Sequence, residues 1–355
     1  MLIIKLLRKI YSKYKLSKFR NFIVNSHHNI SKIDINNIAD MRKHGFTFTE
    51  SQTFDLINND YREYISSWEA YQPRLKDGRY FPISDDKYLF SLVFGNYVRV
   101  PENYALINDG RVIPIKSEKI NANNLYDYLV KLPKGGGGTI KDRGGCDGYN
   151  VYVFSSDGEN LFYKGEICTR EKFAEIINKF KSGIVQEKIT QGKFESAIFD
   201  KSINTVRIIS IRKTKGSGEH EIFAAVQRIG TNISAPVDNF SQGGGSAIIN
   251  LETGELGSMK SITLGQNCYD YHPDTGAKIK GLIIPGWADL KRKIIDLTAK
   301  LPFFDFIAWD IVIQDDGFAV IEINMKSTLN LFQIHGGLRN SKLGQKYAEM
   351  GYLEK

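Results

Sequence analysis

The chain has 355 residues, 42% hydrophobic and 25% charged, which is ordinary for a folded protein and leaves room for two or three lobes. No apolar run approaches the roughly 18 residues that a membrane-spanning helix requires, and charged residues interrupt the apolar start of the chain, which argues against a secretory signal. The cysteines lie far apart and form no CxxC pair, which excludes a disulfide-stapled secreted domain and indicates a cytoplasmic protein.

The net charge is +8, and much of it lies in the first twenty residues, which carry seven lysines or arginines and no acid. Apolar residues recur among them at helical spacing, from Leu2 to Phe19. A solvated helix packed on its own protein explains this pattern most simply. The alternative is peripheral contact with an anionic membrane, at its inner face, or with an acidic polysaccharide. No basic stripe with stacking aromatics follows, so we expect no nucleic-acid partner.

The first half of the chain predicts a helical region followed by short strands and helices. Residues 1–75 are expected to be helical, and Pro82 and Ser84 precede an acidic turn typical of a helix start. Two short strands are expected around the turn Asn108–Gly110. The next expected elements are a helix at Asn123–Leu132, a strand at Val151–Phe154, a helix at Arg170–Phe180 and a strand at Gly183–Ile189.

The second half predicts mainly antiparallel hairpins. Alternating apolar residues indicate paired strands at Ile203–Ile211 and Ile222–Arg228. The remaining expected elements are a strand at Ser246–Asn250, a turn at Leu251–Gly257, an amphipathic helix at Trp287–Leu301, and strands at Phe306–Gln314 and Phe318–Asn324. Because helices and strands do not alternate regularly, the order indicates an α+β fold rather than a doubly wound α/β fold.

Two carboxylates face each other in the last predicted hairpin. The segment Asp315–Gly317 is a turn signal between two apolar runs. If the turn is centred on Asp316, Asp310 and Glu322 lie on neighbouring strands with their Cβ atoms about 5 Å apart. Asn324 lies two residues beyond Glu322 and therefore on the same face.

Such a pair needs charge compensation, because facing carboxylates repel each other. A divalent cation supplies it, and two carboxylates with an amide oxygen suit Mg²⁺ that shares its remaining positions with phosphate oxygens. We therefore expect Asp310, Glu322 and Asn324 to bind magnesium. The alternative is that one acid points to solvent and the other caps a loop.

Glycines are concentrated in a loop after a short strand that ends at Lys141. The loop contains Gly144, Gly145 and Gly148, and glycine lets backbone N–H groups approach phosphates closely. A lysine at the strand end supplies a point charge for a phosphate. The loop matches neither the Walker pattern nor GxGxxG, and a flexible hairpin loop is the alternative. Lys131 competes with Lys141 for this role if its own segment forms a strand.

These features together resemble the ATP-grasp superfamily. The matching stretches are TIKDRGGCDGYNV, IVQEKI and WDIVIQDDGFAVIEIN, which correspond to a lid, a hinge strand and a late D…ExN set. The stretches SINTVRI, QRIGT, VDNFSQGGGSAIINLETGELG and HPDTG resemble more specifically the sugar-transfer-associated ATP-grasp group, related to α-L-glutamate-ligase-like proteins.

The resemblance implies an ATP-grasp fold, in which two α+β lobes clamp ATP after a helical N-terminal region. The implied order is a helical region with a basic start at 1–80, a small α/β region at 81–120, a lid subdomain with the glycine loop at 121–190, and a C-terminal lobe with the magnesium and acceptor sites at 191–355.

The resemblance also implies a role for each matching residue. The residues implied to bind ATP are Lys141 or Lys131, Gly144, Gly145, Gly148, Gln186, Glu187 and Ile189. The residues implied to lie near the triphosphate or the acyl-phosphate are Asn204, Arg207 and Arg228. The residues implied to contact the acceptor are Asp238, Asn239, Gly243, Gly244 and His272. Structural ion pairs are the alternative for the two arginines, and a structural turn is the alternative for His272.

The implied activity is an ATP- and Mg²⁺-dependent carboxylate–amine ligase that works through an acyl-phosphate. Its expected partners are a small-molecule or glycan carboxylate and an amine, because the resembled group is associated with capsular and surface polysaccharides. Two other functions stay open: a kinase-like phosphotransferase that acts on a sugar or another small molecule, and a non-catalytic nucleotide-binding scaffold.

Overall fold

The computed structural model describes residues 17–18, 21, 41–76, 78–115, 120, 124–144, 150–214, 217–265 and 267–354. The chain divides into two compact units, one formed by Met1–Asp77 with Lys326–Lys355 and the other by Gly78–Met325. We call the first the terminal unit and the second the main unit. The expected basic N-terminal helix lies outside the described residues apart from Ser17 and Lys18. Within the described ranges, no helix is long and apolar enough to cross a bilayer.

The terminal unit joins segments from both ends of the chain, so residues 326–355 group with the N-terminal helices rather than with the rest of 191–355. The side-chain amide of Gln333 donates to the carbonyl of Ile65 and accepts from its N–H. Arg339 binds the buried carboxylate of Glu69. Its short helices are α3 (Phe48–Thr53), η1 (Tyr61–Glu63), α4 (Ser67–Ala70), α5 (Gln72–Lys76), α12 (Asn330–Gln333) and α13 (Lys342–Glu349).

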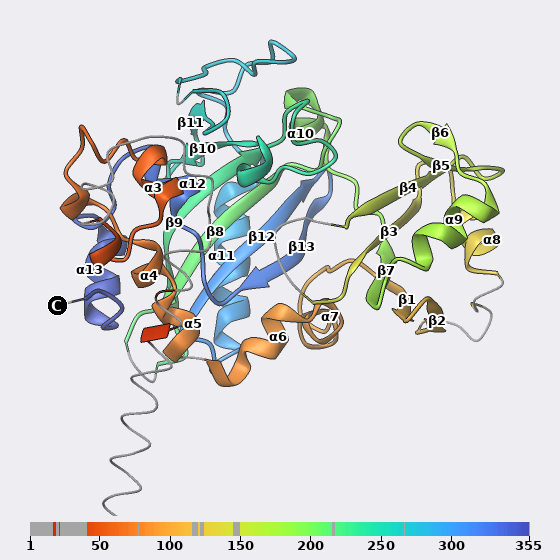
Figure 1. The fold of residues 1–355 in the computed structure, drawn as a ribbon, viewed down its shortest axis with the longest axis horizontal. Helices are drawn as coiled ribbons and strands as arrows, with labels where there is room; N and C mark the ends of the chain where they lie inside the picture. The colour runs from red at the N-terminus through yellow and green to blue at the C-terminus, as the bar shows by residue number, and fades with distance from the viewer. Residues whose placement is uncertain are drawn as a thin grey trace, which may run out of the picture. The chain divides into compact units, whose positions relative to one another are not determined.

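A seven-stranded antiparallel sheet forms one part of the main unit, in the order β2-β1-β7-β3-β4-β5-β6. Helices α8 (Leu125–Val130) and α9 (Arg170–Ile177) pack on one face of it through a core that includes Ile140 and Val185 (Figure 1). Lys141 and Gln186 neighbour these core residues in the chain and therefore point to the opposite face. The strands are β1 (Asn103–Asn108), β2 (Arg111–Pro114), β3 (Gly137–Asp142), β4 (Tyr152–Ser156), β5 (Leu161–Tyr163), β6 (Glu166–Ile167) and β7 (Ser182–Glu187).

A six-stranded antiparallel sheet forms the other part, in the order β11-β10-β9-β8-β12-β13. Helix α11 (Trp287–Ala299) covers one face, where Leu290 and Ile294 pack with Trp309 and Ile208 in the largest core (Figure 1). The strands are β8 (Thr205–Arg212), β9 (His220–Ile229), β10 (Gly245–Ile249), β11 (Leu256–Lys260), β12 (Phe306–Gln314) and β13 (Gly317–Asn324).

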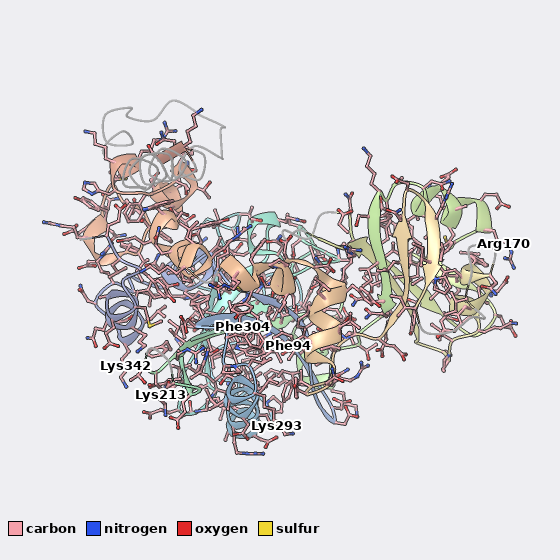
Figure 2. All side chains as sticks on the ribbon, turned by 90° about the horizontal axis from the view of Figure 1, so that it is seen from below. Phe94, Arg170, Lys213, Lys293, Phe304 and Lys342 are labelled. Carbon is pink, nitrogen blue, oxygen red and sulfur yellow. The ribbon has the colours of Figure 1, made fainter. Side chains whose placement is uncertain are left out.

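The segment 81–120 is divided between the two sheets. Helices α6 (Phe81–Asp85) and α7 (Lys87–Phe94) follow the short turn η2 (Gly78–Tyr80), and Phe94 enters the core of the six-stranded sheet. Its ring lies 6.2 Å from that of Phe304 and 5.8 Å from that of Trp309. Figure 2 labels Phe94 and Phe304 among these packed side chains. Strands β1 and β2, in contrast, belong to the seven-stranded sheet.

The expected α+β class is confirmed, and the expected hairpins have the predicted partners. The expected turn at Leu251–Gly257 is wrong at its end, because β11 begins at Leu256 and pairs with β10. The sequence analysis also missed β5, β6 and helix α10 (Lys193–Ile198). Each is only two to six residues long, too short to produce a clear apolar period.

We predict that the terminal unit loses stability as the pH rises from 4.5 to about 7. Burial raises the pKa of Glu50 from 4.5 to about 7, although hydrogen bonds from Thr47 and Ser67 oppose the shift. Between these values the folded protein holds a proton that the unfolded chain has released, so the free energy of unfolding falls by about 3 kcal/mol. Denaturant unfolding across this pH range measures the fall.

The variant Glu50→Gln carries no titrating group at this position, so its free energy of unfolding should change much less with pH. Exposed Glu63 offers the control, since Glu63→Gln should keep the wild-type slope. If the free energy of unfolding of Glu50→Gln fell with pH as steeply as that of the wild type, Glu50 would not be the group responsible.

Candidate functional site

Asp310 and Glu322 are paired in the acidic hairpin as expected, but a β-bulge rather than the position of the turn produces this pairing. The turn between β12 and β13 pairs Gln314 with Gly317, a register that would leave Asp310 opposite Ile321. A β-bulge next to Asp310 adds one residue to β13, and Glu322 becomes the partner of Asp310. Asn324 pairs with Ala308, so its side chain shares the face of the two carboxylates.

Arginines compensate the charge of Asp310. Arg207 is its cross-strand partner on β8 and binds it with two nitrogens, Nε to Oδ1 and Nη2 to Oδ2 at 2.7 Å. Arg228 on β9 adds Nη1 at 3.4 Å from Oδ1 and places Nη2 2.6 Å from Asp238. Guanidinium groups therefore already compensate the charge of one of the two facing acids, Asp310. We call Asp238, Arg228, Asp310 and Arg207 the ion chain.

Two lysines stand near the other carboxylate, Glu322. Burial and the neighbouring charge of Lys87 lower the pKa of Lys141 to about 8, while Glu322 opposes this shift. Burial raises the pKa of Glu322, Asp310 adds to the rise, and Lys87 and Lys141 counteract it. Burial would also raise the pKa of Asp310, but Arg207 and Arg228 outweigh it and hold that pKa below its usual value. Asp310 is therefore the more acidic member of the pair.

The sequence favours a solvated charge for Lys87 over a functional role, but in the structure its charge acts on both Lys141 and Glu322. Lys87 is the first residue of α7, directly after Asp86, whose carboxylate accepts hydrogen bonds from Tyr88 and Leu89. Asp86 also binds Arg143, which follows β3, and the N–H of Lys87 donates to the Arg143 carbonyl at 2.9 Å. These contacts hold the start of α7 beside the end of β3. The available signal was a lysine directly after a helix-capping acid.

The residues expected to bind phosphate do not all lie together in the structure. Lys141 lies on β3, on the face of the seven-stranded sheet away from its core, and Glu322 and Lys87 affect its charge. Lys131 is an exposed residue at the C-terminal cap of α8, so the strand that its candidacy required does not exist. Gly144 is exposed after β3, whereas Gly145 and Gly148 lie outside the described residues.

The expected adenine-binding residues lie at the end of β7. Gln186 is buried and donates from its Nε2 to Asn103 at 2.8 Å, while its buried Oε1 has no partner among the described residues. The Glu187 carboxylate binds Arg99 and the N–H of Glu102, so its side chain is occupied elsewhere. Ile189 is buried in a small cluster with Val312 and Ala319 of the β12–β13 hairpin.

In the structure Asn204 and His272 hydrogen-bond to other parts of the protein. The Asn204 amide is fully buried, donates to the carbonyls of Glu195 and Phe199, and accepts from Gly230 and Ser202. No hydrogen-bonding capacity is left for a ligand.

The imidazole of His272 is similarly occupied. Its Nε2 lies 2.8 Å from the Gly230 carbonyl, and its Nδ1 accepts the N–H groups of Asp274 and Thr275. The ring is buried and stacks on Phe199 at 4.9 Å. With both nitrogens engaged, it cannot serve as a base for an acceptor.

The expected acceptor loop folds tightly beside the ion chain. Asp238 accepts hydrogen bonds from Thr205 and Arg228, so its carboxylate positions the arginine. Asn239 accepts the N–H of Ser241 at the start of the short turn η3 (Phe240–Gln242). Gly243 has φ +109°, and a Cβ on Gly244 would lie 2.5 Å from the Asp238 carbonyl. Both positions therefore require glycine for the loop geometry.

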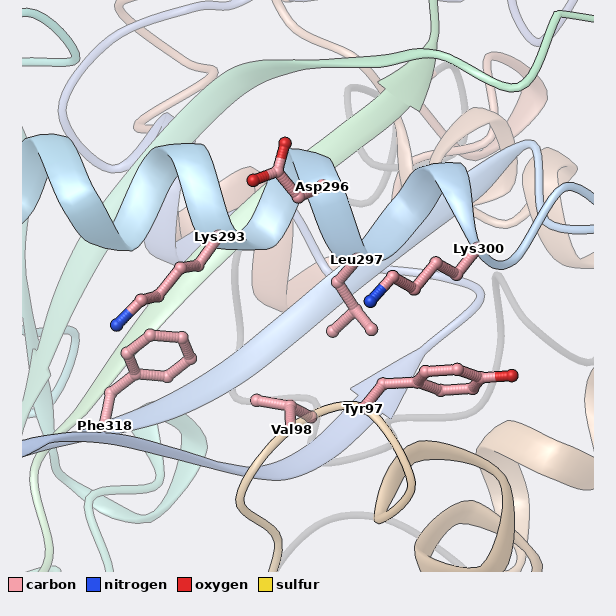
Figure 3. A pocket seen from close by; sticks show the side chains of 7 residues that line it. All are labelled: Tyr97, Val98, Lys293, Asp296, Leu297, Lys300 and Phe318. Carbon is pink, nitrogen blue, oxygen red and sulfur yellow. The ribbon is translucent and has the colours of Figure 1, made fainter.

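A surface hollow of about 270 Å³ lies away from these residues (Figure 3). It lies between Leu297 of α11 and Phe318, which pairs with Ile313 on the face opposite Asp310. Lys293 and Lys300 stand over the Phe318 and Tyr97 rings. The hollow therefore lies on the face of the acidic hairpin opposite to Asp310. In the described part of the chain, no three His, Cys, Asp or Glu side chains form a metal-binding cluster.

We predict that Asn204→Ala destabilises the main unit by roughly 3 kcal/mol, because it leaves buried backbone groups of Gly230, Glu195 and Phe199 without partners. Thermal or denaturant unfolding measures the loss. Mg-ATP affinity, measured calorimetrically where the variant is folded, should stay at the wild-type value. The exposed Asn232 offers a control, since Asn232→Ala should change stability by less than about 0.5 kcal/mol. If Asn204→Ala kept wild-type stability but lost Mg-ATP affinity, Asn204 would instead be a ligand-binding residue.

The similar solved structures include ligases of low sequence identity. They include an L-amino acid ligase from Bacillus licheniformis (9% identity, TM-score 0.36, covering 69% of this chain and 41% of that one). A D-alanine–D-alanine ligase from Bacillus anthracis has 11% identity and TM-score 0.34, covering 76% and 62%. The ATP-grasp ligase PsnB with a minimal precursor has 13% identity and TM-score 0.39, covering 79% and 62%. TM-scores below 0.5 are too low to support conclusions about this chain.

The chain thus spans 41% to 62% of the length of these proteins. Among curated proteins, none matches it significantly. The family model described as sugar-transfer associated ATP-grasp, in contrast, matches residues 67–345, well over half of the chain. This match confirms the resemblance that the motifs indicated. The chain belongs to the sugar-transfer-associated ATP-grasp family.

Proposed function

We propose that this protein is an ATP- and magnesium-dependent carboxylate–amine ligase. In the proposed reaction ATP phosphorylates a carboxylate, an amine attacks the carbonyl carbon of the acyl-phosphate, and phosphate leaves as the amide forms. The observation that carries the proposal is the succession of Glu322, Asp310 and Arg207 on three neighbouring strands, with their side chains on one face. Acids that can hold a cation therefore lie directly beside a fixed guanidinium.

Asp310, Glu322 and Asn324 would hold the magnesium ion. All three offer oxygen atoms from one face of the β12–β13 hairpin, which suits a hard cation. The oxygens of Asp310 already accept hydrogen bonds from Arg207, so cation and guanidinium would share this carboxylate. When bound, the ion would neutralise negative charge on phosphate oxygens.

The seven-stranded sheet offers matching groups for a nucleotide. The unpartnered Oε1 of Gln186 is a buried acceptor on the face that also carries Lys141, and it suits an exocyclic amino group such as that of adenine. Lys87 and Lys141 are the cations that lower the pKa of Glu322 most, and they would bind phosphate oxygens. Gly144 would supply a backbone N–H group.

Arg207 and Arg228 would stabilise the charge that develops on the transferring phosphoryl group. Preorganised donors do this most effectively, because they need no rearrangement during the reaction. Asp310 orients Arg207, and Asp238 orients Arg228. Both guanidinium groups are largely buried, so their positive charge acts in a low-dielectric environment.

The carboxylate and the amine would come from sugar or amino-acid chemistry. The family description associates this chain with sugar transfer. We therefore propose that the enzyme tailors a capsular or surface polysaccharide by joining an amino acid to a uronic acid or an amino sugar. Contact with an acidic glycan or an anionic membrane through the basic residues near the N-terminus would bring it to such a substrate.

We predict that Glu322→Gln reduces Mg-ATP turnover at least about 100-fold, because it removes a charged oxygen donor from the proposed metal site. ADP release measures turnover, and the unfolding midpoint should stay close to that of the wild type. Glu221→Gln makes the same chemical change at an exposed position of β9 in the same sheet and should keep full activity. Normal turnover in Glu322→Gln would contradict the metal assignment.

We also predict that the protein releases ADP and free phosphate in equal amounts when a carboxylate and an amine are both present. A ligase liberates phosphate from the acyl-phosphate, whereas a kinase leaves the phosphoryl group on its product. Parallel ADP and phosphate assays against a panel of amino acids and uronic-acid sugars measure this ratio. ADP release without phosphate would instead identify a phosphotransferase, and Mg-ATP binding without ADP release would identify a nucleotide-binding scaffold.

A further inference from the structure

Glu195 is a fully buried acid that the proposed site does not use. It lies on α10, and its Oε2 accepts a hydrogen bond from Nε2 of Gln227 at 3.0 Å. Its Oε1 is buried and has no hydrogen-bond partner among the described residues. Glu195 also forms no ion pair within these residues, and a carboxylate with one neutral donor is costly to bury. The carboxyl group therefore needs either a proton or another donor.

The buried side chain of Gln227 lacks a partner in the same way. Gln227 lies on β9 opposite Val206 of β8, so it points to the core face of the sheet, away from the side chain of Arg228. Its Nε2 donates to Glu195 and, at 3.2 Å, to the Arg228 carbonyl. Both amide hydrogens are used, which fixes the orientation of the amide. Its Oε1 is buried without a hydrogen-bond partner among the described residues.

The two oxygens without partners belong to side chains that are already joined by one hydrogen bond. Neither oxygen can satisfy the other unless a hydrogen atom lies between them. A proton on Oε1 of Glu195 supplies this hydrogen. The acid and the amide then form a ring closed by one N–H···O and one O–H···O hydrogen bond, and the buried charge disappears. One proton thus accounts for both oxygens and for the lack of a counter-ion.

The surroundings of Glu195 favour its neutral form. Burial raises its pKa well above the usual 4.5, the charge of Asp238 adds to the rise, and the hydrogen bond from Gln227 opposes it. The other charged or titratable side chains on the segments around the pair are Lys193, Arg207, Arg228, His272, Asp310 and Asp315. None of them offsets the effect of burial, so the protonated acid is favoured well above pH 4.5.

We propose that Glu195 holds a proton in the folded protein and donates it to Oε1 of Gln227, so that the two side chains form a closed acid–amide pair on the core face of β9. The pair fixes the Gln227 amide that binds the Arg228 carbonyl, so it supports the backbone of an arginine of the proposed site. Loss of the proton would leave two oxygens without a hydrogen between them. It would also add a negative charge near Asp238, which orients that arginine. Glu195 is thus a proton-dependent support for Arg228, whichever reaction the site performs.

Infrared difference spectroscopy of the full chain at pH 6 tests for the proton. The spectrum of the wild type minus that of Glu195→Gln should contain the C=O band of a protonated carboxyl group and no carboxylate bands. Glu195→Met is apolar and of similar length, so it serves as a second reference and should reveal the same wild-type band. Glu221→Gln is the control, because it removes an exposed carboxylate of β9 and should give carboxylate bands only. Carboxylate bands alone in the Glu195 spectra would overturn the proposal, since they would indicate an ionised acid whose Oε1 receives a hydrogen from a buried water.

Denaturant unfolding above pH 4.5 tests the proton independently. The folded protein keeps a proton that the unfolded chain releases, so the unfolding constant of the wild type should rise by up to about tenfold per pH unit relative to that of Glu195→Gln. This rise ends once Glu195 ionises in the folded protein, and Glu50 contributes equally to both chains. Glu195→Gln should match the wild type near pH 4.5, because its amide can replace the proton, whereas Glu195→Met should unfold at a lower denaturant concentration. Parallel pH curves for the wild type and Glu195→Gln would show that Glu195 holds no proton.

Discussion

The buried ion pair between Arg207 and Asp310 is the interaction on which the organisation of the site depends. Both residues lie on central strands of the six-stranded sheet, and neither charge is accessible enough for water to replace its partner. Removing one member of such a pair typically costs about 3–5 kcal/mol, because the other charge stays buried without compensation. Arg228 and Asp238 extend the pair, so the alignment of β8, β9 and β12 and the position of the following loop are electrostatically coupled.

One face of this sheet forms the hydrophobic core, and the opposite face carries the charged residues of the proposed site. One face packs Trp309, Ile208 and Met259 against α11, and this core gives the sheet a fixed register. The fixed register determines which charges meet on the opposite face. A strand shifted by one residue would bury Asp310 among aromatic side chains and expose Trp309. The apolar face therefore enforces the geometry of the polar one.

The sequence predicted the hairpins and the Asp310–Glu322 pair, because apolar alternation and turn residues are local signals. The assumed centre of the β12–β13 turn was wrong, and a β-bulge brings Asp310 and Glu322 opposite each other. Local sequence patterns do not reveal such a bulge. The sequence did not reveal that Asn204 and His272 are buried and fully hydrogen-bonded, because residue type alone does not distinguish such side chains from those that bind a ligand. For the converse reason the sequence favoured a solvated charge at Lys87, since contacts between distant segments bring it near Glu322 and Lys141.

The union of both chain segments in the terminal unit has a consequence for the order of folding during synthesis. Ile65 receives its hydrogen-bond partners from Gln333, 268 residues later, and Glu69 receives its counter-ion from Arg339. The main unit can complete its sheets as soon as β13 has left the ribosome. The helices that precede it must wait for residues 326–354, although they emerge first. The helices of residues 41–76 are thus among the last to reach their native contacts, although they are made before the main unit, and until then Glu69 stays in water without its counter-ion.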